Sequence, residues 1–201
     1  MFSFGRKTLL AVVAVLMFFG LTINAEAKEI RVGYLVADQL HFPAIMVMKE
    51  RNMLEKEGYT VKWSEFLAGS YVMQEMASGS LDFVSCGAVP ISISHAQGVK
   101  INILASGNQE GSALVVGRDV NSIKDLEGKK IGTPGTGSIQ DAMVAQLLKD
   151  NNVNARRMSM KVSDMPLFLD KGEISAFVAW QPHCARAVAN NFGKILYTSH
   201  D

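Results

Sequence analysis

A regular alternation of β-rich and helical segments is the feature of this sequence that most restricts its fold. Ile30–Leu35 is β-rich, and Pro43 opens a helical stretch from Ala44 to Lys56 that stops at Gly58. The alternation continues with strands expected at 59–66, 81–85 and 101–106 and with helices expected through Ala77 and from Pro90. Strands that alternate with helices at this spacing predict βαβ units and a mostly parallel sheet.

The alternation then starts again near residue 113. Strands are expected at 113–116, 130–132, 157–162, 175–179 and 194–198, with helical segments at 123–126, 139–151, 163–171 and 182–191. No sequence repeat is visible, but the order of elements in 30–106 is echoed in 113–198. We therefore predict two α/β lobes of similar architecture, lobe 1 at residues 28–110 and lobe 2 at residues 111–201.

The first 27 residues are predicted to be a cleavable signal peptide. Arg6 and Lys7 precede an apolar run from Leu9 to Ile23, and Ala25-Glu26-Ala27 supplies a small-residue cleavage site. The alternative is an uncleaved anchor, but the apolar run is short for a span of about 20 residues. No cysteine follows the run, so a lipid anchor is not expected. These features predict a mature protein exported to the periplasm.

Composition excludes several classes of protein. With 48% hydrophobic and 19% charged residues the chain can bury a core, which excludes general disorder. A formal net charge of +1 gives no electrostatic reason to bind nucleic acid or an acidic membrane. Two cysteines are too few for a disulfide scaffold or a four-thiolate zinc site.

Four loops stand where an open parallel sheet binds ligands, beyond the carboxyl ends of strands and before helix N-termini. They are Asp38-Gln39-Leu40-His41, Gly69-Ser70-Tyr71, Cys86-Gly87-Ala88 and the loop from Gly135 to Gln140. Backbone N–H groups at the positive end of a helix suit an anion or a polar oxygen. Each loop by itself is an ordinary cap or turn, but together they favour a small-ligand site.

The glycine-rich loop after residue 132 does not complete a nucleotide motif. Gly132 and Gly137 have the spacing of a phosphate-binding loop, but Ser138 stands where that motif requires lysine. The dinucleotide fingerprint is incomplete as well, since Gly135 and Gly137 are followed by Gln140. We expect no NAD, ATP or other cofactor.

Four segments, taken in order, resemble a known family. They are the run from Val120 to Ser138, the opening Ile30-Arg31-Val32-Gly33-Tyr34, the segment from Met76 to Phe83 and the segment from Lys171 to Phe177. The sequence resembles the substrate-binding proteins of ABC transporters, in the nitrate, sulfonate, taurine and thiamine-precursor (NMT1/THI5-like) group. This resemblance implies a two-lobed periplasmic-binding-protein-like (type II) α/β fold that closes on a ligand by a hinge motion. Family members continue beyond the length of this chain and return to complete the first lobe. The resemblance therefore implies that this lobe, and with it the site, lacks some elements.

The candidate ligand-binding residues come from the four loops, from the segment after 106 and from the end of one strand. They are Asp38, Gln39, His41, Ser70, Tyr71, Cys86, Gly87, Asn108, Thr136, Gly137, Ser138 and Trp180. Trp180 is either a stacking wall of the cleft or a core residue, and Ser138 either contacts the ligand or caps the following helix. Ser70 and Tyr71 carry the same ambiguity.

Metal binding and enzymatic activity are not expected. His41, His183, Cys86 and Cys184 follow no compact metal-binding spacing, and no Cys–His signature surrounds a nucleophile. Export permits a Cys86–Cys184 disulfide, but that bond would tie the lobes together, so we expect free thiols.

We therefore expect the extracytoplasmic solute-binding component of an ABC importer. Its partners would be a small anionic or polar organic solute and an inner-membrane permease, with no nucleic acid and with a monomeric state. No Arg or Lys lies in the four loops, so a neutral or aromatic solute stays an alternative. A ligand-sensing domain for a signalling partner is the competing class.

Overall fold

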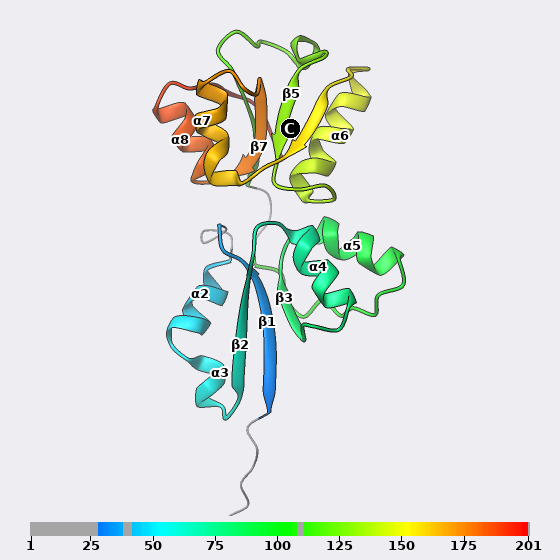
Figure 1. Ribbon diagram of the computed structural model, residues 1–201, viewed down its shortest axis with the longest axis vertical. Helices are drawn as coiled ribbons and strands as arrows, with labels where there is room; N and C mark the ends of the chain where they lie inside the picture. The colour runs from blue at the N-terminus through cyan, green and yellow to red at the C-terminus, as the bar shows by residue number, and fades with distance from the viewer. Residues whose placement is uncertain (1–27, 38–41, 108–110, 201) are drawn as a thin grey trace, which may run out of the picture.

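The structure, a computed structural model, describes residues 28–37, 42–107 and 111–200 and contains two α/β lobes (Figure 1). The predicted signal peptide and the candidate residues Asp38, Gln39, His41 and Asn108 lie outside the described residues. The predicted lobe boundary at 110/111 also falls beside an undescribed segment and stays a prediction.

The first lobe is built on a three-stranded parallel sheet with the order β2-β1-β3. Its strands are β1 (Glu29–Leu35), β2 (Thr60–Phe66) and β3 (Phe83–Ser85). Its helices are α2 (Pro43–Glu50), α3 (Met53–Lys56), α4 (Gly69–Ala77) and α5 (Ala88–Ala96). In Figure 1, α2 and α3 lie on one side of the sheet and α4 and α5 on the other. The core of this lobe is a cluster of Leu35, Val72, Met73, Leu81 and Cys86.

The single helix predicted over 44–56 is wrong. Asn52 adopts a left-handed backbone conformation with φ 49° between α2 and α3, which ends one helix and starts the next. Asparagine enters this region more readily than most residues because its short amide bonds to the local backbone.

The second lobe holds a five-stranded sheet with the order β6-β5-β7-β4-β8. The strands are β4 (Ser112–Val116), β5 (Lys130–Thr133), β6 (Arg156–Ser159), β7 (Ala176–Trp180) and β8 (Lys194–Thr198). The helices are the 3₁₀ turns η1 (Ile123–Leu126) and η2 (Val162–Asp164) and the α-helices α6 (Ile139–Asp150), α7 (Met165–Asp170) and α8 (His183–Ala189). β4 runs antiparallel to both of its neighbours, whereas β5 is parallel to β6 and β7.

Two cores cover the two faces of the second sheet. Phe177 and Val115 belong to the cluster that packs under α7 and α8, whereas Val178 and Leu114 belong to the cluster that packs under α6. Successive strand residues point to opposite faces, so both faces of β4 and β7 are buried and both strands read as continuous apolar runs. Figure 1 shows α6 on one side of β5 and β7 and α7 and α8 on the other.

The echo between the lobes begins at β5 and not at residue 113. The order β6-β5-β7, all parallel, repeats the order β2-β1-β3 of the first lobe. β4 stands outside this repeat as an antiparallel strand between β7 and β8.

The predicted strand at 101–106 is wrong, and the strand order of the second lobe explains why. Its counterpart in the second lobe is β8, which pairs only with β4. The described part of the first lobe has no counterpart of β4 beside β3, so 101–106 has no neighbour with which to form a ladder. Ile103 and Leu104 are consequently 70% and 75% exposed.

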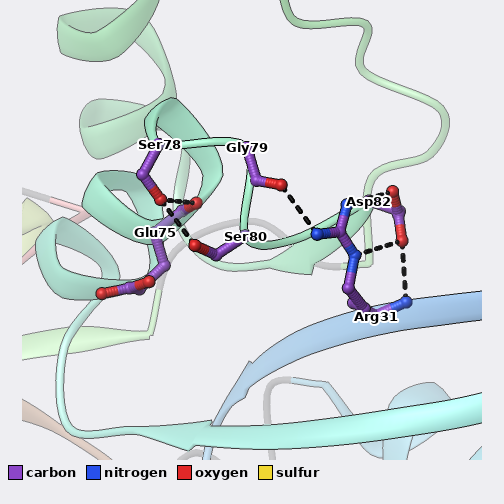
Figure 2. Close-up of polar contacts among 6 residues, drawn as sticks. All are labelled: Arg31, Glu75, Ser78, Gly79, Ser80 and Asp82. Atoms are coloured by element: carbon purple, nitrogen blue, oxygen red, sulfur yellow. Dashed lines mark hydrogen bonds and ion pairs between the residues drawn. The ribbon is translucent and has the colours of Figure 1, made fainter.

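Arg31 connects β1 to the turn between α4 and β3 (Figure 2). Its guanidinium donates two hydrogen bonds to the Asp82 carboxylate, at 2.8 and 3.0 Å, and a third to the Gly79 carbonyl at 2.8 Å. The Arg31 backbone N–H also donates to Asp82 Oδ2 at 2.9 Å. These bonds to Arg31 lower the pKa of Asp82 to about 2.

Of two serines predicted to begin helices, Ser138 does so and Ser163 does not. Ser138 caps α6 as one of its two predicted roles, since its Oγ accepts the Asp141 N–H at 3.1 Å. Ser163 was expected to begin a helix, but it lies inside η2, and its hydroxyl donates to Asp164 Oδ1 instead. The helix begins at Met165, with Pro166 in its first turn.

Candidate functional site

A cavity of about 460 Å³ lies between the two lobes and is the candidate site. Its walls come from twelve residues of the first lobe and seven of the second. The first-lobe residues are Leu35, Phe42, Ala68, Gly69, Cys86, Gly87, Ala88, Ile91, Ile103, Ala105, Ser106 and Gly107. The second-lobe residues are Ser112, Pro134, Ser138, Ile139, Gln140, Trp180 and Ser199. None of these lining residues carries a charge.

Three helix N-termini reach this cavity. Gly69 begins α4, Ala88 begins α5 and Ile139 begins α6, and all three residues line the walls. Each helix exposes unpaired backbone N–H groups in its first turn and carries a partial positive charge there. These N-termini contribute partial positive charge to a cavity whose lining residues include no cationic side chain.

Most polar side chains of the cavity lie on the second-lobe wall, and Ser106 lies on the first-lobe wall. Gln140 Nε2 donates to Ser112 Oγ at 2.7 Å, and the Ser112 backbone N–H donates to Ser199 Oγ at 3.3 Å. Ser112 and Gln140 are 7% and 8% exposed, so both are buried although they line a cavity, and Ser199 is half-buried. Sequence reasoning missed Ser112 and Ser199, because each is a plain serine at a strand end.

Trp180 is a core residue that also forms part of the cavity wall, while its stacking on a ligand stays a prediction. It is 3% exposed, belongs to the second-lobe core and lines the cavity. Its indole N–H donates to the carbonyl of Ala37 in the first lobe at 3.2 Å. The ring of His183 lies edge-on to Trp180 with centroids 6.2 Å apart, and the His183 side chain is buried.

The structure brings only some of the predicted residues to the cavity walls. Cys86, Gly87, Ser138 and Trp180 line it. Ser70, Tyr71, Thr136 and Gly137 are not among the lining residues, and their contact with a ligand stays a prediction.

Three of those residues lie instead on a seam where the lobes touch. A β-carbon built on Gly135 would stand 3.4 Å from Ser70 Oγ and 3.5 Å from the Tyr71 hydroxyl, and one on Gly137 would stand 3.9 Å from Ser70 Cβ. At Gly87 such a carbon would stand 2.1 Å from Ile139 Cδ1 of the other lobe. The missing side chains of these glycines let the lobes approach.

The two cysteines are buried thiols in different places. Cys86 lines the cavity, whereas Cys184 lies in the second-lobe core with its Sγ 3.8 Å from the Ala113 carbonyl. The sequence order, in which His183 and Cys184 follow a strand end at Trp180, suggests that both residues lie in a cleft loop, but this is wrong, because both side chains are buried in the lobe and neither lines the cavity. Burial raises the pKa of Cys86 to about 12 and that of Cys184 to about 11.

Residues 28–37, 42–107 and 111–200 contain neither a metal-binding cluster nor a membrane-spanning helix. No cluster of three or more His, Cys, Asp or Glu side chains in these ranges could hold a metal ion. No helix in the same ranges has the length and apolar character needed to span a bilayer.

The two similar lobes and the shared cavity define the class of fold as two-lobed α/β of the periplasmic-binding-protein type II kind. The alkanesulfonate-binding protein SsuA from Xanthomonas axonopodis pv. citri, solved with bound MOPS, matches with a TM-score of 0.69 at 19% identity. That match covers 87% of this chain and 62% of SsuA. The nitrate-binding protein NrtA from Synechocystis PCC 6803 matches with a TM-score of 0.65 at 15% identity, over 87% of this chain and 52% of NrtA. The predicted fold class is confirmed.

Residues 24–201 match the NMT1-like family, and the chain belongs to that family. The taurine-binding periplasmic protein of Escherichia coli (strain K12) is 27% identical over 200 residues, which cover 97% of this chain and 59% of the relative. The chain thus spans about 60% of the length of such relatives. The predicted family resemblance is confirmed.

Proposed function

We propose that this protein binds a small oxyanion-bearing organic solute in the interlobe cavity, as the extracytoplasmic component of an ABC importer. The observation that carries the proposal is the convergence of three helix N-termini on one cavity shared by both lobes. Such N-termini bind sulfonate, carboxylate or nitrate oxygens without a cationic partner.

The volume and lining of the cavity support an organic solute with an apolar part. About 460 Å³ lies within the ordinary range of small-molecule sites. Leu35, Ile91 and Trp180 line it with apolar surface, while three of the four lining serines and Gln140 lie on the second-lobe wall. A ligand with a polar head and a short apolar body matches both parts.

Family membership supports the transport role. The relatives named above are binding proteins for taurine, alkanesulfonate and nitrate. We propose the same class of activity for this chain, with a periplasmic location and a membrane permease as the partner. Binding requires no covalent step, and we assign no catalytic residue.

A thermal-shift panel followed by calorimetric titration tests this function. The panel contains taurine, ethanesulfonate, nitrate, aromatic acids and uncharged pyrimidines. We expect the midpoint of unfolding to rise with one or more of the anions, because a ligand that binds only the folded state stabilises it. If the midpoint of unfolding rises only with uncharged compounds, the proposal of an anionic solute is overturned. If it rises with no compound, the binding function is overturned.

A further inference from the structure

The structure assigns the head-group recognition of the solute to Ser112, Gln140 and Ser199, which we propose act together as a hydrogen-bond donor array with Gln140 as its specificity-determining residue. This inference rests on the proposed function. Ser112 belongs to β4, Gln140 to the first turn of α6, and Ser199 directly follows β8.

Backbone pairing holds the array in place. The Ser199 backbone N–H donates to the Ser112 carbonyl at 2.9 Å, and the Ser112 N–H donates back to Ser199 Oγ at 3.3 Å. Ser112 also faces Trp180 across the β4–β7 ladder. Gln140 is held from the helix side by its 2.7 Å bond to Ser112 Oγ. Residues fixed by strand pairing and by a helix are suited to recognise one ligand geometry.

The oxygen atoms of the two serines already accept hydrogen bonds, which leaves their protons to donate. Ser112 Oγ accepts from Gln140, and Ser199 Oγ accepts from Ser112. Ser138 Oγ, on the same wall, accepts the cap bond from Asp141. Within the described residues no acceptor takes the hydroxyl protons of these serines or the second amide proton of Gln140. A buried donor without an acceptor is costly, so an acceptor-rich ligand in the cavity would remove that cost.

The carboxylate of Asp141, the residue after Gln140, is engaged by partners outside the array. Asp141 follows Gln140 in α6, and its carboxylate pairs with Arg157 at 2.7 Å and accepts the Gly137 N–H at 3.1 Å. The negative charge of Asp141 is thereby compensated outside the cavity lining, and the charge of Arg157 is used by Asp141. The cavity wall at Gln140 keeps donor groups and no ionised side chain.

The experiment titrates ethanesulfonate and nitrate into the wild-type protein and into Gln140→Glu by calorimetry. The exchange keeps the shape of the side chain but replaces donor hydrogens by a negative charge facing the anion. We expect a loss of affinity of roughly 10- to 100-fold, the range of a hydrogen bond to a charged group. An acidic residue in the first turn of a helix is favourable, so Gln140→Glu is expected to fold.

Gln146→Glu is the matched control. Gln146 lies on the same helix, is exposed and donates to Asp150 at 2.7 Å away from the cavity. The Gln146→Glu variant is expected to bind both anions with the affinity of the wild type. Ser112→Ala is the second variant, and it tests the array if Gln140→Glu does not fold. We expect it to lower the affinity for the anion by about 10-fold, because the Ser112 hydroxyl is lost and the Gln140 amide loses its orienting partner.

The outcomes separate the inference from the proposed function. If the wild type binds either anion and both Gln140→Glu and Ser112→Ala bind it with unchanged affinity, the array is overturned and the proposed function stands. An equal loss in Gln146→Glu would overturn the array as well, since the effect would then be one of helix charge. A wild-type protein that binds neither anion would overturn the array as a site for these head groups, and the proposed function would fall with it only if the rest of the panel also failed to bind.

Discussion

The indole N–H of Trp180 donates a hydrogen bond of 3.2 Å to the carbonyl oxygen of Ala37, across 143 residues of sequence and from one lobe to the other. Trp180 is buried in the second-lobe core, and Ala37 packs against the same cluster. One side chain thus belongs to a core, lines the cavity and contacts the opposite lobe. This bond therefore favours the arrangement in which the two lobes are in contact.

Trp180→Phe is expected to weaken binding of ethanesulfonate by roughly 2- to 10-fold, the range of one neutral hydrogen bond. Phenylalanine keeps an aromatic ring in the cavity but cannot donate to Ala37. Calorimetric titration measures the change. Trp63→Phe is the control, because Trp63 packs against Tyr34 in the first lobe and does not line the cavity. An unchanged affinity in Trp180→Phe would mean that the bond to Ala37 does not favour the bound state.

Gly87→Ala is expected to lower affinity because the new methyl group would stand 2.1 Å from Ile139 Cδ1. Either Ile139 changes rotamer or the lobes stay further apart, and the second response separates the three helix N-termini. The double variant Gly87→Ala with Ile139→Ala removes the clash and is expected to recover most of the affinity. A double variant as weak as Gly87→Ala would show that the effect has another cause.

Asp82→Asn is expected to lower the free energy of unfolding by up to about 1 kcal/mol, the upper range for a pair with this much exposure. The Asp82 pKa is lowered in the folded state by Arg31, so the contribution is present above the unfolded pKa and is lost as the pH falls through about 2. Urea unfolding of both proteins at pH 7 and at low pH measures this. The difference in free energy of unfolding between the two proteins is expected to be present at pH 7 and to become smaller at low pH.

Glu29→Gln provides the comparison for that measurement. Glu29 pairs with Lys62 at 2.9 Å between β1 and β2, and both side chains are more exposed than those of Arg31 and Asp82. Its effect is expected to be the smaller of the two. A pH-independent difference between wild type and Asp82→Asn would contradict the role given to the ionised carboxylate.

Cys86 is expected to react with iodoacetamide more slowly than an exposed thiol at pH 8, because burial raises its pKa to about 12 and little thiolate forms. A ligand in the cavity is expected to slow this labelling further. Cys184, in the second-lobe core, serves as the internal reference, and mass spectrometry of peptides separates the two sites. Ligand protection of Cys184 but not of Cys86 would place the ligand outside the cavity.

Local pattern was sufficient to predict most of the secondary structure. The strand at 194–198 is found with the predicted bounds, and Ser138 caps a helix as its position suggests. The helix broken at Asn52 and the start expected at Ser163 were wrong, because a left-handed residue and a short 3₁₀ turn leave little periodic signal. Element boundaries depend on such local detail more than element type does.

The candidate site was predicted less completely than the fold. Cys86, Gly87, Ser138 and Trp180 line the cavity as expected, because they follow strands or begin helices at one edge of each sheet. Ser112 and Ser199 reach the same wall only because β4 and β8 pair with each other. Nothing in their local sequence distinguishes them from other strand-end serines.

The amino-acid sequence by itself determined the alternation of strands and helices and the positions of the glycine-bearing loops, since these depend on residues near one another in the chain. Tertiary structure decided which strands form and which side chains meet. Residues 101–106 have strand-like composition but no described neighbour, and a strand is stable only when another chain segment accepts and donates its backbone hydrogen bonds. The cavity likewise exists only where residues far apart in sequence, such as Ala37 and Trp180, are brought together by the packing of two lobes.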